Sequence, residues 1–412
     1  MDNGIKGVNA PSNFFRRDML TEGLRSKVRE AIEKMFDDEL TAALEAEKGE
    51  RVDGRKGYRH GFSEPRKIST SFGASEIQVR RGRIVENGKE KEWHSTMLPR
   101  YARRAIAVDQ AIIGIYVSGA NTRRIKTALR PLLRGTPLSK SSVSRMIQRL
   151  KEWFEAWRTQ SLKDVRVMYL YLDGFGVNVR VDGRVVRVPV LAALGVLQTG
   201  AKVLLSLTVM GSESGEGWKL VLEDLSGRGM KPPKLVISDG GSGLQKAIHE
   251  IWPRVDVQRC AVHKLRNLLA KAPEHSHAAI TEDFHRIVYA DNHALAQVAY
   301  QAFLNKWRSR CEGVARSLEE AGVELLTFYR YPKSQWRSLR TTNAIERLNQ
   351  EFRRRMKTQG SLPSSSSVLI LMYALVMTGQ IPMRKIDGAG DMPVSVEHVQ
   401  DYAEQAALPA AA

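Results

Sequence analysis

Cysteine is scarce in this chain: Cys260 and Cys311 are the only two among 412 residues. Two cysteines cannot build the disulfide framework of a small secreted protein, so their scarcity indicates a reducing, intracellular setting. The amino terminus lacks the apolar core of a signal peptide. The longest apolar run, Val368 to Met377, is about half of the roughly 20 residues that cross a bilayer. The sequence therefore predicts a cytoplasmic protein with no membrane association.

Acidic residues are outnumbered by basic ones, 45 Asp and Glu against 64 Lys and Arg, which gives a net charge of +19. An excess of this size favours polyanionic partners and salt-sensitive binding, and nucleic acid is the obvious phosphate polymer. Many basic proteins bind no polyanion, so charge alone leaves that alternative open. The hydrophobic content of 42% is normal for a globular protein, and the length predicts two or three domains of roughly 150 residues each.

The amino-terminal part of the chain is predicted to bind DNA. Residues 1–104 read as a basic region with one helix and short strands, and residues 105–160 as three helical segments. Two short helices and a turn before a basic helix are typical of a helix-turn-helix, and the alternative is a three-helix bundle with a solvated basic face. The basic residues predicted to contact DNA here are Arg123, Arg124, Lys126, Lys140, Arg145 and Arg149.

From residue 165 to 270 the hydrophobic pattern changes to strands with helices between them. Three strands, a helix, a strand, a helix and a strand predict an α/β domain, with helices packed on a mixed sheet. Residues 271–336 are predicted to be a helical insertion, and residues 337–382 the second part of the same domain. The remainder, 383–412, is rich in Gly, Pro and Ala and is predicted to be disordered.

Three acidic residues stand where predicted elements meet solvent. Asp173 and Asp239 each close a strand-like run and each precedes a glycine, whereas Glu346 lies on a predicted helix, 107 residues after Asp239 (346 minus 239). Such carboxylates can hold two divalent cations, which stabilise the attacking and leaving oxygens of a phosphoryl transfer. The alternative for each Asp-Gly pair is an ordinary hairpin or turn. The alternative for Glu346 is a capping box with Asn343.

The predicted helix around Glu346 has two different faces. Ile345, Leu348 and Phe352 form an apolar face for the core, while Glu346 shares the other face with Asn349 and basic residues. A carboxylate followed by a basic stripe suits a metal-bound phosphodiester. The basic residues of this helix that are predicted to contact DNA are Arg353, Arg354, Arg355 and Lys357.

A zinc site is a competing interpretation of the residues between the two parts of the domain. Cys260 and His263 form a C-x₂-H unit, and His275 and His277 follow. The irregular spacing and the single cysteine count against four-coordinate zinc. Thiolate and imidazole ligands are also poor at holding catalytic magnesium.

Taken together, these residues resemble the bacterial insertion-sequence transposases of the Mutator-type family. The matching segments are Leu172–Arg180, Ile237–Leu244, Gln258–Asn267 and Arg340–Asn349, with Gly57–Gly61 and Leu138–Ser144 upstream. The resemblance spans roughly residues 15 to 380. His60 departs from it, since asparagine is expected at that position.

The resemblance implies a fold and a site. The fold would be a ribonuclease-H-like mixed sheet flanked by helices and interrupted by an all-α insertion, with an amino-terminal helical DNA-binding region. The family's catalytic, metal-binding acids fall on Asp173, Asp239 and Glu346. Its Cys-x₂-His signature falls on Cys260 and His263, which favours a location near the active site over a zinc site.

The activity implied is DNA transposition with Mg²⁺, for which Mn²⁺ could substitute. The protein would bind the terminal inverted repeats of an insertion sequence in double-stranded DNA, cleave there, and transfer the freed strand to target DNA. Holding two ends together implies a homo-oligomer, at least a dimer, associated with the bacterial nucleoid. Two alternatives remain: a ribonuclease-H-like nuclease or resolvase that transfers no strand, and a DNA-binding regulator whose carboxylates are structural.

Overall fold

The structure, a computed structural model, describes residues 19–392 apart from 55, 71–72, 87, 99–103, 119, 121, 130–139, 182 and 358–363. These residues form two compact units, and the first passes into the second inside helix α4 (Lys140–Thr159). Helices and mixed sheets together confirm the predicted α/β class. None of the helices in the described ranges combines the length and hydrophobicity that spanning a bilayer requires.

In the first unit a long helix packs against small antiparallel sheets. Helix α1 (Met19–Leu44) buries Phe36 and Leu40, because apolar residues recur about every four positions along it. The strands are β1 (Gly57–Phe62), β2 (Arg66–Thr70), β3 (Gly73–Ile77), β4 (Arg80–Glu86) and β5 (Lys89–Glu92), in sheets β1-β4-β5 and β2-β3. Helices α2 (Ile106–Val117) and α3 (Thr122–Leu129) precede α4.

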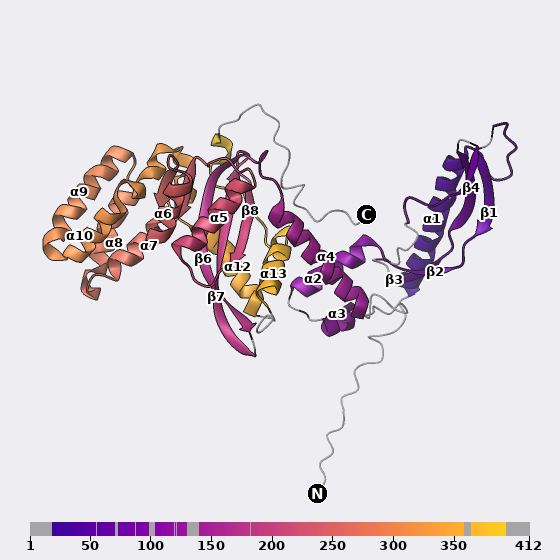
Figure 1. The fold of residues 1–412 in the computed structure, drawn as a ribbon, viewed down its shortest axis with the longest axis horizontal. Coiled ribbons are helices and arrows are strands. Elements are labelled where there is room, and N and C mark those ends of the chain that lie inside the picture. The colour runs from indigo at the N-terminus through magenta and orange to yellow at the C-terminus, as the bar shows by residue number, and fades with distance from the viewer. Residues whose placement is uncertain are drawn as a thin grey trace, which may run out of the picture. The chain divides into compact units, whose positions relative to one another are not determined.

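A five-stranded mixed sheet forms the centre of the second unit (Figure 1). Its strands are β6 (Val167–Val181), β7 (Arg184–Leu197), β8 (Lys202–Val209), β9 (Leu235–Ser238) and β10 (Asp256–Arg259). Strands β6, β7 and β8 form an antiparallel meander, and β9 and β10 run parallel to β6, giving the order β10-β9-β6-β7-β8. All of β9 is buried, as expected of a short parallel strand covered on both faces.

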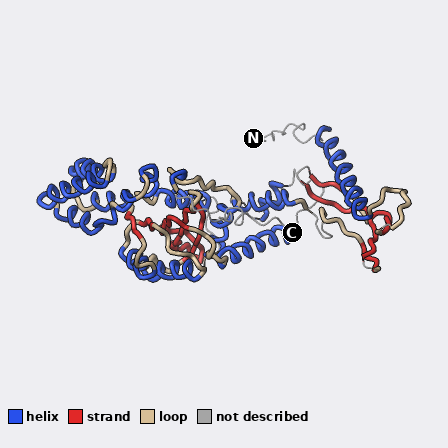
Figure 2. Tube along the Cα trace, turned by 90° about the horizontal axis from the view of Figure 1, so that it is seen from above, coloured by secondary structure: helices blue, strands red, loops and turns tan. Residues whose placement is uncertain are grey.

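Helices cover both faces of this sheet (Figure 2). They are α5 (Gly215–Gly227), α6 (Ser242–Ile251), α12 (Asn343–Lys357) and α13 (Ser365–Met377). Alternate side chains of β6 point to opposite faces, and Leu170 and Leu172 join the core formed with α5 and α6. On the other face, the ring of Phe175 stacks on that of Phe352 from α12, with centroids 6.1 Å apart. Asp173 belongs to the same alternate set as Phe175 and therefore faces α12.

The chain between β10 and α12 is helical. Its helices are α7 (Ala261–Leu269), α8 (His277–Val288), α9 (His293–Arg310), α10 (Glu312–Ala321) and the short α11 (Trp336–Leu339). This stretch is described throughout and contains 3-10 turns but no strand. Arg259 and Lys264, both buried, form ion pairs with Glu320 of α10 at 2.7 and 2.8 Å. These pairs fix the helical insertion to the end of the sheet.

The prediction that the chain is disordered from residue 383 onward is wrong for residues 383–392. Ile386 and Met392 are buried, and the N–H of Ile386 donates to the carbonyl of Gly200 at 3.1 Å. These buried side chains, together with hydrogen bonds to Gly200, Gln335 and Ser338, hold the segment in place despite its glycines. The rest of the predicted tail, 393–412, lies outside the described residues.

Candidate active site

The two aspartates lie beside one another across the sheet. Strands β6 and β9 pair in parallel with Tyr171 opposite Ile237, and continuing this register by two residues brings Asp239 opposite Asp173. Asp239 follows the last residue of β9, as predicted. The prediction that Asp173 closes its strand is wrong, since β6 continues to Val181. No described strand pairs with that edge of β6 from Asp173 onward, so the edge is open beside both carboxylates.

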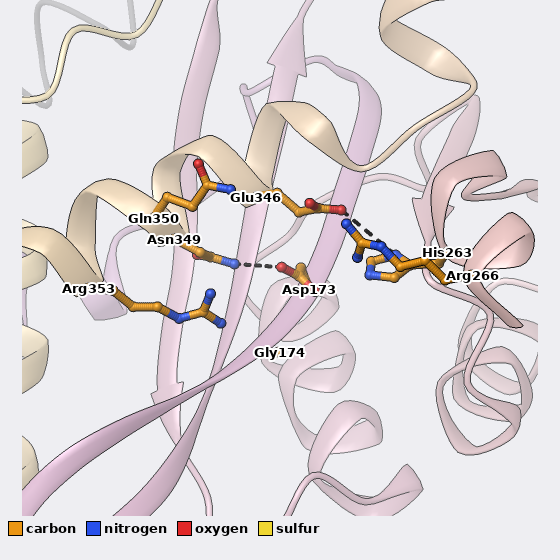
Figure 3. A pocket seen from close by; sticks show the side chains of 8 residues that line it. All are labelled: Asp173, Gly174, His263, Arg266, Glu346, Asn349, Gln350 and Arg353. Atoms are coloured by element: carbon orange, nitrogen blue, oxygen red, sulfur yellow. Dashed lines mark hydrogen bonds and ion pairs between the residues drawn. The ribbon is translucent and has the colours of Figure 1, made fainter. Parts of the chain in front are cut away.

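Helix α12 brings Glu346 to the same edge. The pocket there is lined by Asp173, Gly174, His263, Arg266, Glu346, Asn349, Gln350 and Arg353 (Figure 3). Asp239 is not among these lining residues, and its Oδ1 accepts the N–H of Gly241 at 3.0 Å. The negative charge of Asp239 nevertheless acts on Asp173. The charges of Asp239 and Glu346 therefore both reach the carboxylate of Asp173.

The other two carboxylates disfavour the charged form of Asp173. Burial raises the pKa of Asp173 to about 6, and the charges of Asp239 and Glu346 add to the rise. The hydrogen bond from Asn349 and the charge of His263 oppose it. A cation would remove the repulsion. Three carboxylates supply the hard oxygen donors that Mg²⁺ and Mn²⁺ prefer.

Asn349 holds the Asp173 carboxylate from α12. Its Nδ2 donates to Asp173 Oδ2 at 2.7 Å, as Figure 3 shows, and the residue is only 1% exposed. Its Oδ1 is buried and has no hydrogen-bond partner among the described residues, a costly condition that a ligand in the pocket would relieve. Its distance of one helical turn from Glu346 is the only sequence signal for this role.

The first turn of α12 contradicts the predicted capping box. The helix begins at Asn343, and Thr342 precedes it, with its carbonyl accepting the N–H of Glu346 at 2.9 Å. The N–H of Asn343 donates to the hydroxyl of Thr341 at 3.4 Å. The Glu346 carboxylate points into the pocket, where Oε1 accepts the Thr342 hydroxyl at 2.8 Å and lies 3.8 Å from Nδ1 of His263.

Cys260, the residue before α7, and His263 within α7 support this turn. The Sγ of fully buried Cys260 accepts the N–H of Thr342 at 3.3 Å and lies 3.2 Å from its hydroxyl oxygen. Burial opposes ionisation of the Cys260 thiol, but hydrogen bonds from His263 and Thr342 lower its pKa overall. The hydrogen bond with Cys260 raises the pKa of His263 to about 9 against the effect of burial, and Glu346 adds to the rise. The two shifts share one cause, the interaction between the Cys260 thiol and the His263 imidazole.

The interpretation that Cys260 and His263 form a zinc site with His275 and His277 is wrong. In the described part of the chain, Cys260 and His263 share their neighbourhood with Glu346, their ligand atoms lying within 4.8 Å of one another. His277 is occupied elsewhere, with Nε2 3.1 Å from the carbonyl of Ala272. The Cys-x₂-His unit lies beside the carboxylates, where the resemblance to the family put it.

Comparison with known proteins decides the identity of the chain. Residues 9–380 match the family described as Transposase, Mutator family. The chain belongs to the Mutator family of transposases. It is 35% identical to the transposase for insertion sequence element ISRM5 of Rhizobium meliloti, over 86% of this chain and 87% of the relative. It is 31% identical to the transposase for IS1201 of Lactobacillus helveticus, over 87% and 95%. It is 33% identical to the transposase for IS406 of Burkholderia multivorans, over 92% and 94%.

The basic residues of α12 in this transposase face different surroundings. Arg353 lines the pocket, and its guanidinium carbon lies 5.5 Å from the ring centroid of Phe175. Arg354 is exposed and forms an ion pair with Glu351. Arg355 donates to the side chain and carbonyl of Gln380 at 3.3 and 3.4 Å. Of these three, Arg353 is the one that faces the carboxylates.

Two more basic residues, Lys357 of α12 and Arg266 of α7, belong to the helices that line the pocket. The side chain of Lys357 lies outside the described residues. Arg266 of α7 also lines the pocket, although sequence reasoning did not select it. Its spacing of three residues from His263 places both on one helix face, which was the available signal.

The upstream basic residues predicted to contact DNA lie on α3 and α4 of the transposase. Arg124 of α3 and Arg145 and Arg149 of α4 are exposed, and Arg145 donates to the carbonyl of Ser141 at 3.3 Å. The side chains of Arg123, Lys126 and Lys140 lie outside the described residues, as does the predicted turn at 135–139. The exposed arginines are accessible to a polyanion.

Proposed function

We propose that Asp173, Asp239 and Glu346 are the catalytic carboxylates of this transposase and hold two Mg²⁺ ions, which Mn²⁺ can replace. The convergence of three acids from β6, the end of β9 and α12 carries the proposal. The donor set fits these ions: every ligand offers hard oxygen, and the carboxylates repel one another without a cation. The unpaired Oδ1 of Asn349 also fits a pocket built around a ligand.

The domain that holds these acids is ribonuclease-H-like. Its sheet begins with three antiparallel strands in sequence order and adds two strands parallel to the first, which supports this assignment. The acids lie on the central strand β6, after its neighbour β9, and on a helix that comes late in the chain. Helices α7 to α11 form the all-α insertion.

In transposition, some residues of the pocket bind the DNA and others position the carboxylates. When bound, the ions supply Lewis-acid stabilisation of charge on the phosphodiester oxygens. The attacking groups are water and then the freed 3′-hydroxyl of DNA, so no nucleophilic side chain is required. Arg353 and Arg266 bind phosphate oxygens. Asn349 fixes the orientation of Asp173, and the Cys260–Thr342 contact fixes the turn that presents Glu346.

Double-stranded DNA is the substrate both as the element's inverted repeats and as the target. The exposed arginines of α3 and α4 contact the repeat DNA, consistent with the net charge of +19. Because two ends must be brought together before joining, the transposase works as a homo-oligomer, at least a dimer.

The test compares wild type, Glu346→Gln and Glu351→Gln on a duplex carrying the element's end, with Mg²⁺ present. Glu346→Gln removes a charge while keeping the side chain's size. Glu351→Gln, five residues further along α12, removes the same charge from a residue paired with Arg354 and serves as the matched control. Cleavage and strand-joining products are measured on gels, and DNA binding by fluorescence anisotropy.

We expect Glu346→Gln to lose cleavage and joining while it binds DNA as wild type does, and Glu351→Gln to remain active. Equal activity of wild type and Glu346→Gln would refute the catalytic role of Glu346. Cleavage without any joined product from a supplied 3′-hydroxyl end would favour a nuclease or resolvase.

A further inference from the structure

A fourth carboxylate lies against the catalytic strand. Glu213, in the turn between β8 and α5, directs its carboxylate onto Gly174, the residue that follows Asp173. A Cβ at position 174 would lie only 2.6 Å from Cδ and 2.9 Å from Oε2 of Glu213. Real Cβ atoms do not come so close to other heavy atoms, so glycine at this position leaves the space that the carboxylate occupies.

We propose that Glu213 is a fourth acidic ligand of the metal site, joining Asp173, Asp239 and Glu346. The proposal rests on the function proposed for those three residues. It adds a ligand from a segment of the chain that none of them belongs to.

The open edge of β6 allows this carboxylate to reach the site. Asp173 points to the face covered by α12, whereas Gly174 points to the face covered by α5 and α6. Strand β9 ends at Ser238. Beyond that residue no described strand lies along this edge of β6, so the two faces of the sheet meet there. A ligand at that edge can be approached by Asp173 from one side and by Glu213 from the other.

The position of Glu213 is fixed by the first turns of two helices. Ser214 is the N-cap of α5, and its side chain accepts the N–H of Gly217 at 3.2 Å. The backbone of Gly215 packs against Gly243 in the first turn of α6, since a Cβ at position 243 would lie 2.9 Å from Gly215 Cα. Glu213 and Asp239 therefore each precede a helix whose first turn touches the other's.

The carboxylate of Glu213 is exposed and has the negative charge of Asp239 in its surroundings. Partial burial raises the pKa of Glu213, and the negative charge of Asp239 adds to the rise. Among the described residues, none forms an ion pair or hydrogen bond with the Glu213 carboxylate. Independently, the buried Oδ1 of Asn349, across the same edge, has no partner in the described structure. A divalent ion at this edge would offset the negative charge of Glu213.

The experiment measures Mn²⁺ binding to the full-length, metal-free protein by electron paramagnetic resonance of the free ion. The variants are Glu213→Gln, Asp173→Asn and the control Glu216→Gln, which removes the same charge from an exposed residue in the first turn of α5. We expect Glu213→Gln to weaken binding of at least one Mn²⁺ by about tenfold or more. Glu216→Gln should bind as wild type does.

A stability measurement separates loss of a ligand from loss of the fold. In EDTA, the melting temperature of Glu213→Gln should equal or exceed that of wild type, because the change removes a charge that Asp239 disfavours. Wild-type Mn²⁺ affinity in Glu213→Gln, together with reduced affinity in Asp173→Asn, would overturn this inference and leave the proposed function intact. Failure of wild type to bind Mn²⁺, or no effect of Asp173→Asn, would overturn both.

Gly174→Ala provides a second variant that leaves every carboxylate in the chain. Its new methyl group would displace the Glu213 carboxylate, so it should weaken Mn²⁺ binding in the wild-type background. In the Glu213→Ala background the methyl group meets no carboxylate, and no further loss is expected. An equal loss in both backgrounds would contradict the inference.

Discussion

The sulfur of Cys260 accepts the backbone N–H of Thr342 at 3.3 Å, which joins the end of β10 to the residue before α12. The N–H of Cys260 in turn donates to the carbonyl of Ser238 at 2.8 Å, directly before Asp239. One cysteine therefore links the turns that present two of the three acids, Asp239 and Glu346. This gives a structural role to half of the Cys-x₂-His unit.

We predict that Cys260→Ala lowers the free energy of unfolding by about 1–3 kcal/mol, because the buried N–H of Thr342 loses its acceptor. Cys260→Ser should lose less, since a hydroxyl oxygen can accept the same bond. Denaturant unfolding followed by tryptophan fluorescence measures the change. Cys311→Ala, at the other cysteine, is the control and should be close to wild type. Equal stability of Cys260→Ala and wild type would contradict the linking role.

The pH dependence of stability should follow Asp173 when no metal is bound. Its pKa is about 6 in the folded protein against an ordinary 3.8, so the folded state holds the proton more tightly than the unfolded state. The resulting stabilisation is complete below about pH 3.8 and is lost as the pH rises through 6. In EDTA, Asp173→Asn should therefore become more stable than wild type between about pH 4 and 7.

The gain should then stay constant at higher pH, at about 1–3 kcal/mol, because one pKa unit corresponds to about 1.4 kcal/mol. Thermal melts across this pH range measure it. Adding Mg²⁺ should stabilise wild type and have a much smaller effect on Asp173→Asn. A gain that shrinks as the pH rises would contradict the expected sign.

Arg259 should matter to catalysis without touching DNA. Its buried guanidinium donates to the carbonyl of Gly240 at 2.6 Å and pairs with Glu320 of α10, so it ties the insertion to the turn that follows Asp239. We predict that Arg259→Met destabilises the protein by about 2 kcal/mol or more and slows cleavage at saturating Mg²⁺. DNA affinity should be unchanged. Arg316→Met, an exposed arginine of α10, is the control.

DNA binding should depend steeply on salt. If about eight phosphates are contacted, log K should fall against log salt with a slope near −7. Arg353→Ala should reduce that slope by about 1, because Arg353 lines the pocket. Arg354→Ala should change it little, because Glu351 already neutralises that side chain. Anisotropy titrations between 50 and 300 mM salt, about the range in which such slopes are read, would measure both, and a slope near zero would exclude phosphate contacts.

Several elements of the second unit follow directly from the sequence. The second of the two helices predicted between residues 165 and 270 is α6, because its apolar positions recur at helical spacing after a glycine. The extent of β6 did not follow, since Gly174 and Gly176 are poor strand formers. Pairing with β7 along nearly the whole strand outweighs that local preference. Tertiary contacts of this kind cannot be read from a local pattern.

The sequence predicted the three acids of the site because each one lies at a recognisable point of a local pattern, a strand-like run or a helix. The contacts between them had no local signal: Asn349 reaches Asp173 across 176 residues of sequence. Glu213 gives no sequence signal at all, because it precedes an ordinary helix start and becomes visible only when its carboxylate is seen against Gly174. Long-range packing decides which polar residues meet, and periodicity contains no information about it.

The separation of Glu346 from the two aspartates has a consequence during synthesis on the ribosome. At roughly 5–20 residues per second, the 107 residues between Asp239 and Glu346 take about 5–20 seconds to translate. Until α12 has emerged, β6 and β9 can pair, but the third acid and Asn349 are missing from the pocket. The complete pocket therefore forms only after the chain has been synthesised through α12.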